Sequence, residues 1–260
     1  HQILELAGVH ARRTDCYALT TVGYMGNNVL PARAGEALRV VLLSQRSDGS
    51  KRTLLGSVVA ERMLDLIALV TIFVVTVYGV LSTSEVLPTD HPLVVTAVGV
   101  GLVLAGAVAV WVLRAHHIFE RARDWLRPLA DAPRALLNRR GLLLLAGTFV
   151  LWSLEATVYL AVARAIDVNF SVSGALYLVA LTNFVAALPA APGSIGTFDA
   201  AVAFGAKALG ASGSAALSYV ILLRFVLYVP ITVFGLVVLV TRYGGWSRLR
   251  SAARLEASRA

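Results

Sequence analysis

The most constraining feature of this chain is a polar, helix-breaking stretch that lies between two apolar runs. Residues 27–39 read NNVLPARAGEALR, in which a proline and a glycine disfavour a continuous helix and Arg33, Glu36 and Arg39 carry charge. Charged groups and non-helical backbone are tolerated at membrane depth only where protein or a water-filled cavity satisfies them. If the flanking runs lie in a membrane, this stretch is therefore a site and not an ordinary loop.

Composition places the flanking runs in a membrane. Hydrophobic residues make up 58% and charged residues 15% of the 260 residues, and the mean hydropathy is +0.76; soluble domains have about a quarter charged residues. The net charge of +8 comes from basic residues in short segments between apolar runs, a pattern of membrane topology and not of a nucleic-acid partner. The single cysteine, Cys16, excludes an internal disulfide, and no spacing predicts a metal site or a cofactor.

The apolar runs predict an all-α, polytopic membrane protein with four full spans and two re-entrant half-helix hairpins. A span needs about 20 apolar residues. The runs of that length are residues 54–81, 93–113, 141–166 and 214–241. The shorter runs are residues 16–30, 34–43, 174–188 and 200–209, which form two pairs, each joined by a polar break that contains proline.

The two breaks are similar in sequence. LPARAG at residues 30–35 is matched by LPAAPG at residues 188–193, and each precedes an arginine inside a span, Arg62 or Arg224, by some thirty residues. Loops without Lys or Arg are external under the positive-inside rule, which puts the mouths of the two hairpins on opposite sides. We therefore expect an inverted repeat whose breaks meet near the bilayer midplane.

The whole chain, residues 1–260, is expected to form a single transmembrane domain. The first repeat covers about residues 16–113 and the second about residues 141–241. Between them, residues 114–140 are rich in arginine and form either a helix on the cytoplasmic surface or an ordinary cytoplasmic linker. The polar tail, residues 242–260, is expected to be cytoplasmic.

Charged residues inside the predicted spans point to a polar interior. Asp65 lies some 16 Å into its span, and Glu155 lies well inside another. A charge at the bilayer centre costs at least about 2.5–3.5 kcal/mol on insertion scales, so these groups should face inward. Two structural alternatives stay open: Arg62 can pair with Asp65 three residues later, and an isolated Glu155 can be protonated and hydrogen-bonded.

Three motifs, in order, carry a family resemblance. NNVLPARAGEALR, VVAERMLDL at residues 58–66 and LPAAPGSIGTFDAA at residues 188–201 resemble the transmembrane domain of lysylphosphatidylglycerol synthases and the wider flippase-like family. The resemblance implies a helical membrane protein that, in the best-known members, moves aminoacylated phosphatidylglycerol across the cytoplasmic membrane. Other members are linked to isoprenoid-glycan or glycolipid pathways, so the lipid is not implied. Because members usually have further spans before the first motif, this chain is expected to lack N-terminal spans, and also an aminoacyl-transfer domain.

The candidate substrate-binding residues are the polar groups and glycines of the two breaks and of the spans. Guanidinium groups suit phosphate, the acids would balance them or contact a cationic headgroup, and the helix N-termini after the breaks would add positive dipole ends. The set is Asn27, Asn28, Arg33, Glu36, Arg39, Glu61, Arg62, Asp65, Glu155, Asn183, Gly193, Ser194, Gly196, Thr197 and Arg224. The alternatives are close packing for the glycines and an interfacial turn with snorkelling arginines for residues 33–39.

The sequence therefore predicts a lipid flippase or transporter in the cytoplasmic membrane, with its C-terminus in the cytoplasm. Its partner would be a membrane lipid, either an anionic phospholipid or an aminoacylated or glycosylated lipid, whose headgroup crosses through a polar midplane cavity; homo-oligomerisation is left open. An integral-membrane transferase acting on a phospholipid or a polyprenyl-phosphate, with Glu61, Asp65 or Glu36 as base, is the alternative. A small-ion channel or a structural partner comes third.

Overall fold

A computed structural model describes residues 1–79, 138–187 and 191–245. These residues form helices and 3₁₀ turns, with no strand among them, so the predicted all-α class is confirmed. The elements are α1 (Gln2–Leu6), α2 (Arg13–Val29), η1 (Pro31–Arg33), α3 (Ala34–Ser44), α4 (Lys51–Gly79), α7 (Arg139–Ala165), α8 (Val172–Ala187), η3 (Pro192–Ser194), α9 (Thr197–Ala208) and α10 (Gly213–Tyr243). The span expected at residues 93–113, most of the arginine-rich segment and the end of the tail lie outside the described residues.

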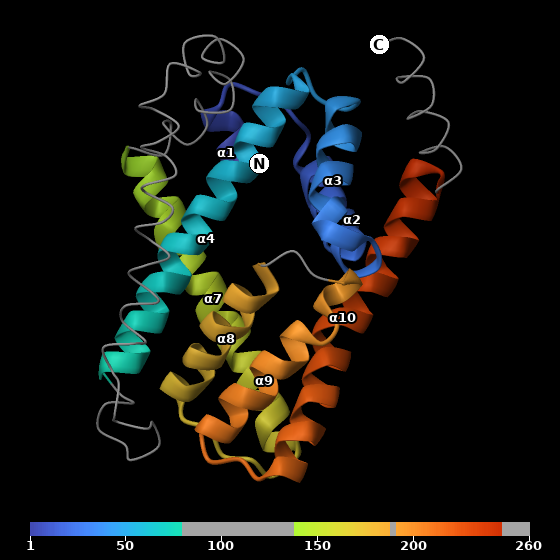
Figure 1. Ribbon diagram of the computed structural model, residues 1–260. Helices are drawn as coiled ribbons and strands as arrows, with labels where there is room; N and C mark the ends of the chain where they lie inside the picture. The colour runs from blue at the N-terminus through green and yellow to red at the C-terminus, as the bar shows by residue number, and fades with distance from the viewer. Residues whose placement is uncertain (80–137, 188–190, 246–260) are drawn as a thin grey trace, which may run out of the picture.

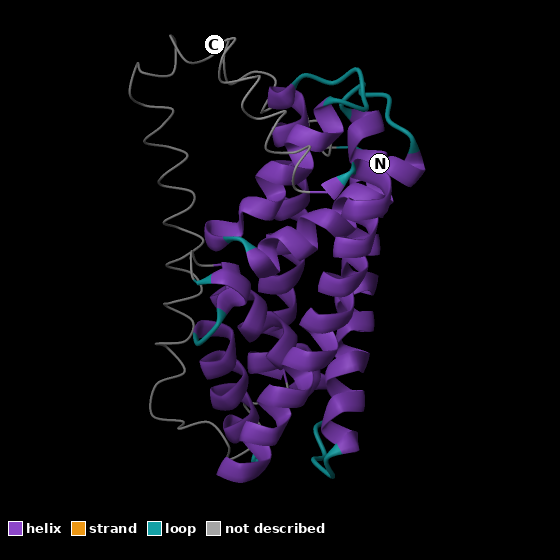
Figure 2. Cartoon of the chain, turned by 90° about the vertical axis from the view of Figure 1, so that its right-hand side faces the viewer, coloured by secondary structure: helices purple, strands orange, loops and turns teal. Residues whose placement is uncertain are grey.

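Three long helices and two shorter helix pairs make up the bundle. Helices α4, α7 and α10 run along its height, α2 and α3 occupy the upper half, and α8 and α9 the lower half (Figure 1). The turned view shows the helices following one long axis (Figure 2). The 3₁₀ turns η1 and η3 contact each other near mid-height. The two helix pairs therefore lie at opposite ends of the bundle, and their breaks meet between them.

The order of elements before each long helix is the same in both halves. A helix, a 3₁₀ turn, a shorter helix and a long helix follow one another with lengths of 17, 3, 11 and 29 residues in the first half. The lengths are 16, 3, 12 and 31 residues in the second half. Arg62 is the twelfth residue of α4 and Arg224 the twelfth of α10. Glu36 is the third residue of α3 and Asp199 the third of α9.

The outer surfaces of the long helices are apolar. Helices α7 and α10 are both long and apolar enough to cross a membrane, and among the described helices only these two meet that test. Large side chains on them, such as Leu142, Leu151 and Phe225, are more than half exposed. Helix α4 spans some 43 Å at 1.5 Å per residue, but it carries three charged residues near its middle. Exposed apolar faces around a polar interior suit a hydrocarbon surrounding.

Each break stops its helix through backbone geometry. Pro31 opens η1, and Arg33 adopts a left-handed conformation with φ of 55°. In the second break Gly193, Ser194 and Gly196 all have positive φ, between 50° and 86°. Left-handed backbone cannot continue a right-handed helix, and it is unusual for a residue with a side chain. The chain therefore turns at both places and begins a second short helix.

Glycine contacts hold α2 between α3 and α10. A Cβ on Gly35 of α3 would overlap the carbonyl oxygen of Gly23 and the amide of Asn27. On the other side of α2, a Cβ on Gly235 of α10 would overlap the side chain of Met25. Small residues allow this close approach of helix backbones. The first hairpin is thus fixed against the last described helix.

Candidate functional site

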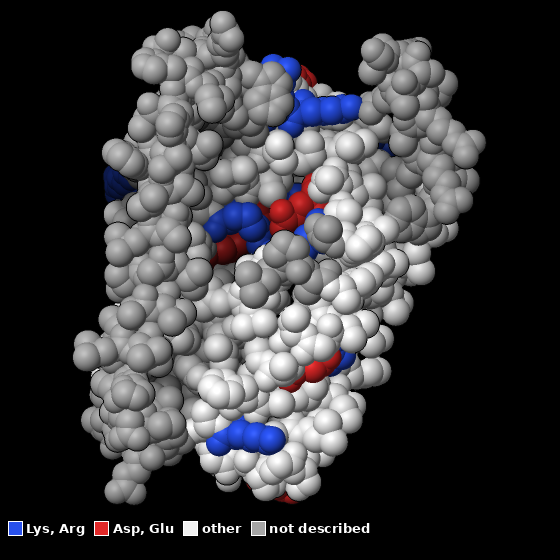
Figure 3. Space-filling view, in the orientation of Figure 1, with Lys and Arg blue, Asp and Glu red and all other residues white. Residues whose placement is uncertain are grey.

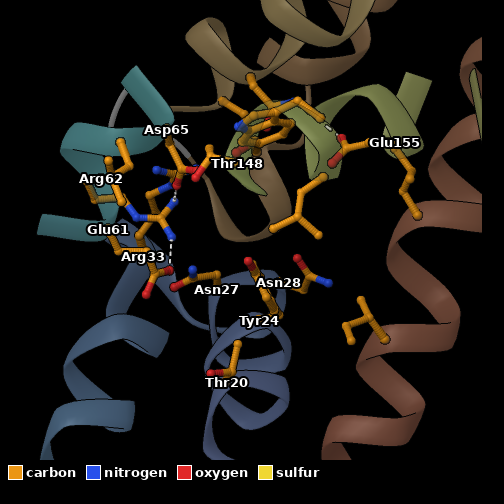
Figure 4. Close-up of a pocket in the computed structure, with 18 of the residues that line it drawn as sticks. Thr20, Tyr24, Asn27, Asn28, Arg33, Glu61, Arg62, Asp65, Thr148 and Glu155 are labelled. Carbon is orange, nitrogen blue, oxygen red and sulfur yellow. Dashed lines mark hydrogen bonds and ion pairs between the residues drawn. The ribbon is translucent and has the colours of Figure 1, made fainter. Parts of the chain in front are cut away.

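A cavity of about 940 Å³ lies where the two breaks meet. It is lined by parts of α1, α2, α4, α7, α8, α9 and α10 and by both breaks. Basic and acidic side chains lie next to one another at mid-height on the face shown in Figure 3. The main polar lining residues are Thr20, Tyr24, Asn27, Asn28, Arg33, Glu61, Arg62, Asp65, Thr148, Glu155, Asn183 and Ser194. Figure 4 shows Arg62 and Asp65 on one side of this space and Glu155 on the opposite side.

One wall of the cavity is a network of two arginines and three carboxylates. Arg39 Nη2 lies 2.7 Å from Glu61 Oε2. Arg62 contacts Glu61, lies 3.2 Å from Asp65 Oδ2, and its Nε is 3.7 Å from Glu36 Oε1. The pair predicted three residues apart, Arg62 with Asp65, is confirmed. With three carboxylates against two arginines, the network holds more negative than positive formal charge.

Arg33 differs from the other two arginines of the first half. It belongs to η1, lines the cavity and keeps its left-handed backbone. It forms no ion pair with any described residue, whereas Arg39 and Arg62 are both paired. A strained residue with an unpaired charge at a cavity is typical of a functional site. Arg33 is therefore the guanidinium most available to an anionic group.

Glu155 lies on α7, away from the arginines. Asn183 Nδ2 of α8 donates to Glu155 Oε1 over 3.4 Å and to the carbonyl of Val179 over 2.9 Å. The second of these bonds has the better geometry, so the amide is only a weak partner for the carboxyl. Within the described part of the chain, no Lys, Arg or His forms an ion pair with Glu155.

Arg224 is held in place by its own surroundings and does not line the cavity. Its Nε donates to Asp199 Oδ1 over 2.6 Å, and its other nitrogens donate to the carbonyls of Gly193 and Ser194 over 3.1 and 3.4 Å. The guanidinium also lies over the ring of Tyr228, 4.7 Å from its centroid. These contacts tie α10 to the backbone of the second break. They leave few donors of Arg224 for a ligand.

The structure brings most of the candidate residues together but not all of them. The candidates that line the cavity are Asn27, Asn28, Arg33, Glu61, Arg62, Asp65, Glu155, Asn183, Gly193 and Ser194. Glu36 and Arg39 lie behind them as ion-pair partners of Arg62 and Glu61. Gly196 and Thr197 begin α9, where the Gly196 amide donates to Asp199. That bond ties the Asp199 carboxylate to the residue just before α9.

Two candidate residues carry buried polar atoms without a hydrogen-bond partner. These are Asn27 Oδ1 and Arg62 Nε. Buried polar atoms in folded proteins are nearly always hydrogen-bonded to protein or to water. Both residues line the cavity, so two polar atoms packed into its wall have no hydrogen-bond partner among the described groups.

The sequence-based candidates did not include the aromatic residues that line the cavity, or Asp199, the ion-pair partner of Arg224. Tyr24, Trp152, Tyr159 and Tyr228 line the cavity, and as isolated aromatic residues in apolar runs they give no sequence signal that separates them from lipid-facing ones. Asp199 does have a signal, because it occupies the same place after its break as Glu36. No group of three or more metal-ligating side chains lies within the described ranges.

Comparison with known proteins gives the family. A family model described as the lysylphosphatidylglycerol synthase TM region matches residues 1–235. The chain belongs to this family. It is also similar to a UPF0104 membrane protein of Methanocaldococcus jannaschii, with 20% identity over 216 residues that cover 80% of this chain and 90% of that protein. No solved structure matches.

Membership of the lysylphosphatidylglycerol synthase TM family agrees with the resemblance found in the three motifs. The matched range includes both breaks, all three long helices to within a few residues of the end of α10, and every residue that lines the cavity. The cavity is thus a feature of the family's membrane region in this chain.

Proposed function

We propose that this protein moves the polar headgroup of a membrane lipid across the cytoplasmic membrane through the cavity between the two breaks. The observation that carries the proposal is the position of that cavity. It lies about halfway along helices of membrane-spanning length, its lining includes five charged side chains among apolar ones (Arg33, Glu61, Arg62, Asp65 and Glu155), and it is surrounded by helices with apolar outer faces. Transporters bind their substrates at such places, between broken helices near the midplane.

The two helix pairs are proposed to be re-entrant hairpins related by an inverted repeat. Several observations support this: the recurring order of elements, the contact between η1 and η3, and the equivalent places of Arg62 and Arg224. Short helices with non-helical breaks can lie in a membrane when they are buried in protein or line a cavity. The gating of one repeat against the other would then expose the cavity to each side in turn.

The C-terminal end is proposed to lie in the cytoplasm. The end of the bundle at which α2, α4 and α7 begin and α10 ends carries most of the basic residues of the described part. They are Arg12, Arg13, Arg46, Lys51, Arg52, Arg139, Arg140 and Arg242, against Arg164 and Lys207 at the other end. This asymmetry supports a cytoplasmic upper end under the positive-inside rule.

Within the cavity, Arg33 is proposed to bind the phosphate of the headgroup. It has no described ion-pair partner, and guanidinium donors match phosphate oxygens. Asn27 and Asn28 lie nearby on α2 with further polar atoms. The acyl chains would stay among the exposed apolar side chains of α7, since Leu143 and Leu151 both line the cavity and are exposed at its rim.

Movement of labelled lipids in proteoliposomes tests the proposal. Phosphatidylglycerol, phosphatidylethanolamine and an aminoacylated phosphatidylglycerol, each with a fluorescent acyl chain, would be compared for loss of signal to an impermeant quencher. We expect at least one lipid to move faster with the protein than in empty vesicles, and Arg33→Gln to slow it. Lys207→Gln is the matched control, because Lys207 is an exposed cation on α9 outside the cavity.

The same preparation separates the transferase alternative from the flippase. Glu61 and Asp65, the proposed bases of a transferase, are both engaged with arginines, which favours a structural role for them. Chromatography of the lipids after the assay would show any new lipid species. A new species without movement would contradict the flippase and support the transferase.

A further inference from the structure

Glu155 stands apart from the other two carboxyls that line the cavity. Glu61 is paired with Arg39, and Asp65 with Arg62. Glu155 has no ion pair with a described residue and receives only the 3.4 Å hydrogen bond from Asn183. It lies some 24 Å from the start of α7, deep inside a helix of membrane-spanning length. No described residue therefore compensates its charge.

The charged groups that face Glu155 do not supply a counter-ion. Asp65 faces it from α4 with the same sign of charge, while Arg62 beside it is already shared by three acids. Arg33 of η1 lines the same cavity without forming an ion pair with Glu155. The tyrosines nearest to it are Tyr228 on α10 and, one turn along α7 itself, Tyr159, whose hydroxyl forms a hydrogen bond with Thr182; Tyr24 of α2 lines the same cavity beside the arginine network.

An uncompensated carboxylate in such a place is costly and must be neutralised by a proton or a bound cation. A metal cation would need several oxygen ligands, and no group of three or more acidic, histidine or cysteine side chains surrounds Glu155 in the described ranges. The acids that line the cavity are Glu61, Asp65 and Glu155, against two lining arginines, Arg33 and Arg62. One proton on Glu155 makes the charge of this lining zero.

We propose that Glu155 is a proton-binding site that couples headgroup movement to the proton gradient. Glu155 takes up a proton when the cavity is open to the more acidic side and releases it when the cavity is open to the other side. The inference rests on the proposed lipid movement and names its energy source. Protonation removes the excess negative charge of the cavity lining, which favours the state in which a phosphate-bearing headgroup is bound beside Arg33.

Infrared titration of the protein in vesicles of phosphatidylethanolamine and phosphatidylglycerol tests the proton site without any transport. We expect the wild type to show the carbonyl band of a protonated carboxyl that disappears as pH rises. Glu155→Gln should lack this band, and Glu155→Asp should keep it with a shifted midpoint. Asp167→Asn, an exposed carboxyl just after α7, is the matched control and should leave the band unchanged. A titrating band that Glu155→Gln leaves intact would overturn the assignment.

A pH gradient across the same vesicles, with the membrane potential clamped, tests the coupling. If one proton moves with each lipid, one pH unit biases the distribution of the lipid between the leaflets by up to about tenfold, the equivalent of 1.36 kcal/mol. We expect this bias in the wild type and in Glu155→Asp, and none in Glu155→Gln at any rate of movement. Wild-type movement that ignores the gradient would overturn the coupling and leave the flippase standing. A wild type that moves no lipid would overturn the proposed function itself.

Discussion

Asp199 and Arg224 form an ion pair in the second half at places equivalent to those of Glu36 and Arg62 in the first. The distance from Arg224 Nε to Asp199 Oδ1 is 2.6 Å, whereas that from Arg62 Nε to Glu36 Oε1 is 3.7 Å. Arg224 is further held by two carbonyls and an aromatic ring. The equivalent pairs therefore have different surroundings in the two halves. In the second half Arg224 is bonded to the break before it, whereas in the first half Arg62 lines the cavity.

Substitution Asp199→Asn should destabilise the fold. The hydrogen bond to the Arg224 guanidinium and the cap on the Gly196 amide both depend on this carboxylate, and hydrogen bonds to charged groups contribute about 1.5–3 kcal/mol. Thermal unfolding in detergent micelles measures the effect. Arg164→Gln, at an exposed cation near the end of α7, should leave the unfolding temperature unchanged; an equal loss in both variants would contradict the role of the pair.

Substitution Gly35→Ala should separate α2 from α3. Its Cβ would overlap backbone atoms of Gly23 and Asn27, which cannot move aside as a flexible side chain can, and overpacking costs about 1–3 kcal/mol. Gly147→Ala is the control, because a Cβ there meets nothing within 4 Å on an exposed part of α7. The control should be neutral or slightly stabilising, since alanine favours helix over glycine. Comparable unfolding temperatures for the two variants would refute the contact.

Substitution Arg33→Gly should slow lipid movement without lowering the stability of the fold. Glycine adopts the left-handed backbone of this position without strain, which removes about 1–2 kcal/mol of cost, and this offsets the extra freedom of glycine in the unfolded chain. We expect unchanged or higher stability together with slower lipid movement in the proteoliposome assay. Full movement in a folded Arg33→Gly protein would exclude Arg33 as the phosphate-binding group.

The Arg39 and Glu61 pair should show strong energetic coupling. The two side chains are 13% and 29% exposed and lie 2.7 Å apart. A double-mutant cycle with Arg39→Gln and Glu61→Gln, read by thermal unfolding, should give a coupling energy within about 0.5–3 kcal/mol, the range for residues in contact. Additive effects of the two substitutions would show that the pair does not contribute as a unit.

A pH-dependent contact outside the membrane joins the loops before α2 and after α3. The backbone amide and the ring Nδ1 of His10 hydrogen-bond to the Asp48 carboxylate at 2.8 and 2.9 Å, and these bonds hold the pKa of Asp48 below its usual value. A lowered pKa stabilises the fold above the carboxyl's ordinary pKa, and this contribution is lost as pH falls through the lower, folded value. Wild type and Asp48→Asn should therefore differ in unfolding temperature at pH 7 and converge in acid.

The sequence predicted the helices better than it predicted the roles of the charges. The predicted hairpin helix at residues 34–43 and the observed Ala34–Ser44 differ by one residue, because proline and glycine stop helices through local backbone physics. The partner of a charge depends instead on which helices meet. Arg224, like Arg62, follows a break by some thirty residues, but its ion pair with Asp199 is seen only where α9 packs against α10.

The sequence also did not predict the shortest helix or which isolated aromatic residues line the cavity. Helix α1, Gln2–Leu6, was not predicted, since five residues of mixed polarity give no period to detect. Tyr159 is fully buried and lines the cavity, but a single tyrosine in an apolar span has the same sequence signature whether it faces lipid or protein. Both features are determined by tertiary packing, which local propensity does not encode.

The contact between α2 and α10 bears on how the protein is made. Asn28 Nδ2 donates to Thr232 Oγ1 across 204 residues of chain, and Asp15 is paired with Arg242 in the same way. At about 5–20 residues per second, a ribosome needs roughly 10–40 s to synthesise the chain between Asn28 and Thr232. During that time Asn28 lacks this hydrogen-bond partner, because α10 has not yet been synthesised. The packing of α2 against α10 is thus expected to be a late event in the biogenesis of this protein.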